Sequence, residues 1–85
     1  GLDNPQLSEL FAWEPNDFDV RTAGSPIRRI GYERWLRNIA VALGNAPTTP
    51  AITAALERRR DHASALVREH VSWALAQHAK GEHHT

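Results

Sequence analysis

The apolar positions of this sequence recur every three or four residues, which is the spacing of one helix face. The clearest example spans residues 32–43. Its apolar side consists of Tyr32, Leu36, Ile39 and Leu43. Residues 52–56 and 67–75 repeat the spacing more briefly, and no segment alternates apolar and polar residues as a half-buried strand does. The pattern therefore predicts an all-α chain of about four to six helices, some of them short.

Capping residues and prolines indicate where these helices begin and end. Three pairs place a capping side chain before a proline, a combination typical of helix starts: Asn4-Pro5, Ser25-Pro26 and Thr49-Pro50. Ser64 is predicted to cap the last helix. We expect Gly31 to break the chain before residue 32, and Gly44-Asn45 to end the helix that follows.

Two of the predicted helices resemble each other in sequence. Residues 36–46 align with residues 68–78, so that Ile39 pairs with Val71. Helix pairs repeated at such a period are typical of α-solenoids of the HEAT type, although a plain three- or four-helix bundle is the alternative. The expected organisation is a single domain with short capping helices in 1–24, HEAT-like helices in 25–80 and a disordered tail in 81–85.

Length and composition restrict the classes of protein that this chain can belong to. Its 85 residues fit one small domain, and the absence of cysteine excludes disulfides and thiolate metal ligands within it. There is no apolar run long enough to cross a membrane and no signal-peptide pattern, so we expect a cytoplasmic, monomeric protein. The opening GLDNP, without a methionine, suggests a piece of something longer.

Charge is unevenly spread although the net charge is zero. Residues 1–20 carry −5, residues 21–60 carry +6 and residues 61–85 carry −1. The positive middle contains a cluster of four arginines with aromatic neighbours: Arg28, Arg29, Arg34 and Arg37, with Tyr32 and Trp35 between them. A guanidinium group binds phosphate through paired hydrogen bonds, and an aromatic ring stacks on unpaired bases. Two interpretations stay open: an RNA surface, or solvated arginines with Glu33 pairing Arg37.

No catalytic, cofactor-binding or metal site is predicted within these residues. There is no nucleophile in a strand–turn–helix setting, and the serines serve better as helix caps. His70 and His78 lie eight residues apart on one helix, too far to share an ion, and no HExxH motif occurs. Trp73 falls outside the apolar side of the last helix. We expect the N-terminal helices to cover it, the alternative being a docking surface for another domain.

A family resemblance adds to this interpretation. The segment LSELFAW, followed by F-x-x-x-T-A-G-S-P-I-R-R-I-G-Y-E-R-W-L-R-N-I-A-V-A-L-G-N, closely resembles the C-terminal part of bacterial epoxyqueuosine reductases. The likeness continues more loosely through HASALVREHVSWALAQ and so covers most of the chain. The block at 24–45 is specific because many unusual residue pairs occur there in fixed order.

The resemblance implies a part in the last step of queuosine synthesis, the reduction of epoxyqueuosine to queuosine in the anticodon of tRNA. It implies a HEAT-like C-terminal domain that helps hold the tRNA beside upstream catalytic domains, which carry cobalamin and two four-iron–four-sulfur clusters. Without cysteine this chain cannot ligate those clusters. What the resemblance carries over is a domain role, for which the predicted RNA-contacting residues are Arg28, Arg29, Arg34, Arg37, Asn38 and Trp35. The alternative is a module that buttresses the cofactor domains without binding RNA.

Overall fold

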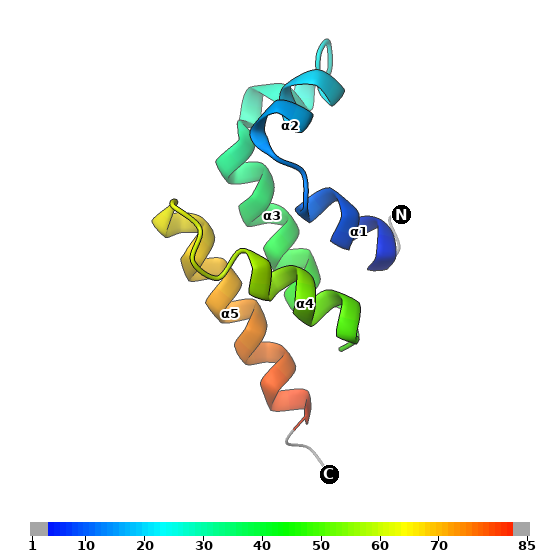
Figure 1. The fold of residues 1–85 in the computed structure, drawn as a ribbon, viewed down its shortest axis with the longest axis vertical. Coiled ribbons are helices and arrows are strands. Elements are labelled where there is room, and N and C mark those ends of the chain that lie inside the picture. Colours follow the sequence, from blue (N-terminus) through cyan, green and yellow to red (C-terminus); the bar gives the residue numbers. More distant parts are fainter. Residues whose placement is uncertain (1–3, 83–85) are drawn as a thin grey trace.

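The computed structural model describes residues 4–82, and this part of the chain is entirely helical (Figure 1). Its five α-helices and one 3-10 helix are α1 (Asn4–Phe11), α2 (Pro15–Arg21), η1 (Pro26–Ile30), α3 (Tyr32–Gly44), α4 (Pro50–Arg58) and α5 (Ala65–Glu82). The prediction of an all-α chain with four to six helices is confirmed. Of the expected tail, residues 81–82 continue α5, and residues 83–85 lie outside the described part.

The predicted caps are present where the structure describes them. The side chains of Ser25, Thr49 and Ser64 each accept a hydrogen bond from a backbone amide two or three residues further on, at 3.2–3.3 Å. These bonds satisfy amides that have no partner inside the helix. Gly31 has a φ of +85°, a left-handed conformation that favours glycine, and it separates η1 from α3 as expected.

The core lies between α3 and α5; α4 packs on both of these helices, and α1 packs on α3 and α4. The largest fully buried side chains include Phe11, Leu36, Leu43, Ile52, Leu56, Val67 and Val71. The apolar faces predicted for α3, α4 and α5 therefore meet in one cluster, while Tyr32 and Leu75 pack at its edge. In Figure 1, α3 and α5 lie side by side and run in the same general direction, with α4 returning the chain between them. The HEAT-like assignment stays a prediction.

Helix α3 ends at Gly44 as expected, and one expectation near that end needs correction. Gly44 has no positive φ, so left-handed backbone is not the reason for glycine here. A Cβ at this position would lie 2.4 Å from Cζ3 of Trp73, which shows that the glycine makes room for the indole ring. The N-terminal helices do not cover Trp73, because they pack on α3 and α4 and the ring stays 38% exposed on α5.

Candidate nucleic-acid interface

Two of the predicted RNA-contacting arginines lie on η1. Arg28 and Arg29 are exposed, and no hydrogen bond or ion pair engages the side chain of either one within residues 4–82. With residues 24–26 they line an open hollow of about 510 Å³. The Ser25 cap and the turn at Gly31 fix the backbone on both sides of η1, so the two guanidinium groups project from an ordered segment.

The other polar residues predicted for the interface lie on α3, directly after Gly31. Arg34 is exposed and has no partner among the described residues. Arg37 donates from Nε to Oδ1 of Asn38 at 2.8 Å. We call Arg28, Arg29 and Arg34 the arginine corner, because their guanidinium groups are exposed and unpaired where η1 meets α3.

The ion pair between Glu33 and Arg37, which belonged to the alternative interpretation of the arginines, is not formed between these two described residues. The carboxylate of Glu33 instead accepts a hydrogen bond from the hydroxyl of Ser64, at the start of α5. The i,i+4 spacing allowed the ion pair, but the packing of α5 against α3 brings a closer partner to Glu33. Arg37 is therefore held by its neighbour Asn38 rather than by an acid.

Trp35, the predicted stacking group, is half-buried inside an aromatic cluster. Its ring stacks on Trp13 with centroids 5.5 Å apart and packs against Phe18 at 5.6 Å. Its indole nitrogen is buried and has no hydrogen-bond partner among the described residues. Trp35 thus already fastens α1 and α2 to α3, and a contact between its ring and a base stays a prediction.

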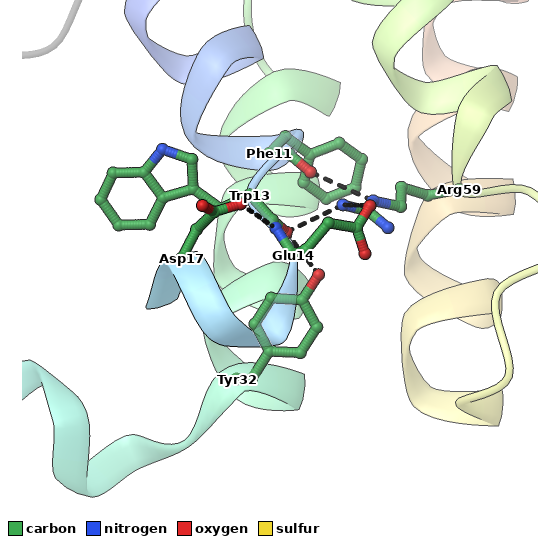
Figure 2. A network of polar contacts seen from close by, with 6 residues as sticks. All are labelled: Phe11, Trp13, Glu14, Asp17, Tyr32 and Arg59. Carbon is green, nitrogen blue, oxygen red and sulfur yellow. Dashed lines mark hydrogen bonds and ion pairs between the residues drawn. The ribbon is translucent and has the colours of Figure 1, made fainter. Parts of the chain in front are cut away.

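Sequence reasoning missed the role of Arg59, which follows α4 and is 12% exposed in its side chain. Its Nε donates to the carbonyl of Phe11 at 3.1 Å, and its Nη2 donates to the carbonyl of Trp13 at 2.9 Å. Figure 2 shows the guanidinium group reaching from the end of α4 to the link between α1 and α2. Basic residues at a helix C-terminus interact favourably with the helix macrodipole. Because this effect already accounts for an arginine at the end of α4, there was no reason in the sequence to predict the long-range contact of Arg59.

The same network includes an ion pair and a tyrosine. Arg59 lies 3.7 Å from the carboxylate of Glu14, which is 69% exposed, and the hydroxyl of Tyr32 donates to the carbonyl of Trp13 (Figure 2). Burial raises the pKa of Tyr32, and the nearby positive charge of Arg59 opposes this in part. The network joins three elements, so the arginine at 59 is structural and is not available to a ligand.

A second polar group lies at the start of α5. The backbone amide of Ser64 donates to Nδ1 of His62 at 3.0 Å, so this nitrogen must be unprotonated. Burial first, and then the charge of Arg59, hold the pKa of His62 below its usual value. His62 therefore helps order the loop before α5 in its neutral form.

The histidine at position 78 is buried. It is 3% exposed, and its Nε2 donates to the carbonyl of Leu43 at 2.7 Å, while Nδ1 lies 2.7 Å from the hydroxyl of Thr48. This residue ties the C-terminal ends of α3 and α5 together. In the part of the chain that the structure describes, no three His, Cys, Asp or Glu side chains gather as a metal site, and no helix is long and apolar enough to span a membrane.

Comparison with known proteins identifies relatives of one kind. The chain is 66% identical over 77 residues to epoxyqueuosine reductase from Xanthomonas campestris, which is 91% of this chain and 22% of that protein. It is 60% identical to the Pseudomonas aeruginosa enzyme of the same name, over 93% of this chain and 22% of the relative. For the Escherichia coli enzyme the identity is 57%, over 89% and 20%. No family model matches the chain, and no solved structure does.

These relatives match nearly the whole chain, whereas the chain spans only about a fifth of their length. The resemblance seen in the sequence is therefore confirmed, and it is consistent with a C-terminal domain. At 57–66% identity the shared ancestry is beyond question. The chain belongs to the epoxyqueuosine reductase family as a homologue of one helical segment of those enzymes.

Proposed function

We propose that this chain acts as a non-catalytic, C-terminal domain of an epoxyqueuosine reductase and contacts the tRNA substrate through the arginine corner. The parent enzyme would reduce epoxyqueuosine to queuosine in the tRNA anticodon, in the cytoplasm. The observation that carries the RNA contact is that the side chains of Arg28, Arg29 and Arg34 are exposed and have no partner within residues 4–82. Arg37 and Asn38 lie next to them on α3 and would extend the same surface.

Free arginines favour this assignment for an energetic reason. An arginine that already pairs with an acid or a carbonyl must give up that partner before it binds phosphate, as Arg59 would. The three residues of the arginine corner have no such partner to lose within the described residues. Their planar donor groups can each bind phosphate oxygens through two hydrogen bonds, and the ordered backbone of η1 limits the entropy lost on binding.

The iron–sulfur clusters of the proposed parent would be held outside this chain. Such clusters are bound by cysteine thiolates, and the sequence contains no cysteine. The proposal assigns cobalamin to other parts of the parent enzyme as well, and the domain would contribute binding of the substrate rather than chemistry.

Charge reversal in a full-length reductase carrying this domain tests the proposal. The variant R28E/R29E/R34E should weaken binding of an anticodon stem-loop RNA by at least tenfold, because three attractive charges become repulsive. The matched control, R58E/R60E/K80E, makes the same change in charge at exposed residues of other elements and should alter affinity much less. Equal losses for both variants would indicate a non-specific charge effect, and no loss for the first would refute the RNA contact.

The alternative function is a module that supports the iron–sulfur and cobalamin domains without binding RNA. In that case the arginine corner would pair with acids of those domains. The same triple reversal would then lower the melting temperature or the cluster content of the full-length enzyme and leave RNA affinity unchanged. Measuring both quantities on one preparation separates the two functions.

A further inference from the structure

The exposed Trp73 on α5 is held in a defined position. Its ring lies against the backbone of α3 at Gly44, where an added Cβ would come within 2.4 Å of Cζ3 and 3.0 Å of Cε3. The side chain is nevertheless 38% exposed, which is unusual for the largest apolar residue. The glycine therefore lets one side of the indole pack closely while another part of the ring remains open to solvent.

A hollow of about 330 Å³ lies beside this ring. It is lined by Val41 of α3 and by Glu69, His70 and Trp73 of α5. Nδ1 of His70 lies 2.9 Å from the carbonyl of Leu66, which can only accept, so Nδ1 carries the proton and the ring is oriented. The hollow thus has an oriented histidine and a packed tryptophan in its wall, and both belong to rigid helices.

The domain's own elements leave this side of α3 and α5 bare. No residue of α1, α2, η1 or α4 lines the hollow. The Cα positions of the described chain fill a slab only 16 Å thick, against 47 and 27 Å in the other directions. In a slab this thin, helices that pack on one side have little to cover the other. Tryptophan is enriched among the residues that contribute most to protein interfaces.

We infer that the surface formed by Val41, His70 and Trp73 docks an apolar segment of the reductase polypeptide outside these 85 residues. This inference rests on the proposed place of the domain in a larger enzyme. The relatives carry about four-fifths of their length beyond the part that this chain matches, so further polypeptide that could dock here is covalently linked to the matched part in them. The one formal charge in the lining, Glu69, is negative. It would repel an RNA phosphate but tolerates an apolar or basic protein segment.

Hydroxyl-radical footprinting of an intact full-length reductase carrying this domain tests the inference. For each tryptophan, the oxidation rate in the native protein is divided by the rate in denaturant. Trp73 should be protected at least as strongly as the half-buried Trp35, although it is more exposed in the domain by itself. Weak protection of Trp73 would overturn the inference. Protection that depends on protein concentration would assign the surface to a second copy, and protection only after tRNA addition would assign it to RNA; either result also overturns it.

A pair of variants gives an independent readout. Trp73→Glu in the full-length enzyme should increase oxidation of His70, whereas Ser72→Glu, the same charge at an exposed neighbouring position, should not. RNA affinity should stay within twofold for both variants, because the arginine corner is unchanged. In R28E/R29E/R34E, a loss of RNA affinity with unchanged protection of Trp73 from oxidation would support the proposed function independently of the docking inference. If Trp73→Glu and Ser72→Glu behave alike, no segment docks on this surface.

Discussion

The guanidinium group of Arg59 is predicted to be a main source of stability in this small domain. It donates to two main-chain carbonyls, those of Phe11 and Trp13, and its side chain is nearly buried. Hydrogen bonds to charged groups contribute about 1.5–3 kcal/mol each. In Arg59→Met the carbonyl of Trp13 keeps the hydroxyl of Tyr32, but the carbonyl of Phe11 loses its side-chain donor. We therefore expect a loss of about 2–4 kcal/mol.

Such a loss is large for a chain of this length, whose total stability should be about 4–13 kcal/mol. Urea unfolding followed by tryptophan fluorescence measures it, because Trp13 lies in the network. Arg58→Met is the matched control: its side chain is exposed and has no partner among the described residues, so the change should stay within about 0.5 kcal/mol. Arg59→Lys should fall between the two, since an ammonium group cannot reach both carbonyls with the fork geometry of arginine.

The ion pair between Arg59 and Glu14 allows a check on whether the stability comes from the carbonyl contacts of Arg59 or from its charge pairing. The carboxylate is largely exposed, so the pair should contribute less than about 1 kcal/mol, and Glu14→Gln should be nearly neutral. The loss in Arg59→Met should also persist in 0.5 M salt, which screens exposed charges but not buried hydrogen bonds. If Arg59→Met and Arg58→Met cost the same, or if Glu14→Gln costs as much as Arg59→Met, the carbonyl contacts are not what stabilises the domain.

Three further substitutions have definite expected outcomes. The pKa of His62 is lowered in the folded state, so the stabilisation that neutral His62 provides is present above pH 6.5 and is lost as the pH falls through the folded pKa. Urea unfolding should therefore give a lower free energy of unfolding at pH 5 than at pH 7.5. His62→Gln should make this difference between the two pH values smaller. Gly44→Ala should cost about 1–3 kcal/mol by thermal unfolding, and much less when Trp73 is also alanine, because the clash is with its ring. His78→Phe should cost about 1–3 kcal/mol in urea unfolding, because two hydrogen bonds are lost, one to the Leu43 carbonyl and one to the Thr48 hydroxyl, while that carbonyl keeps the amide of Ala46; a loss below about 0.5 kcal/mol would contradict this role.

Local signals in the sequence predicted the helices and their starts well. The caps Ser25, Thr49 and Ser64 act on amides two or three residues away, and the face around Leu36 follows from helical periodicity alone. These features depend on neighbours in the chain, which a single sequence displays directly.

Contacts between distant residues were beyond this kind of reasoning. Arg59 binds carbonyls 46 and 48 residues away, and Glu33 pairs with a serine 31 residues away instead of with Arg37. Both depend on how the helices pack, which periodicity does not determine. The exposure of Arg34 was predictable because it falls off the apolar face of α3, whereas the packing of Trp35 against Trp13 required the placement of the N-terminal helices.

The salt dependence of RNA binding tests the central claim most directly. A full-length reductase carrying this domain and its R28Q/R29Q/R34Q variant would be titrated with an anticodon stem-loop RNA over a range of salt concentrations. Each phosphate contact contributes about 0.7–0.9 to the slope of log K against log salt, so three contacts predict a slope shallower by about 2–3 in the variant. Identical slopes for the two proteins would contradict the assignment of the arginine corner to RNA.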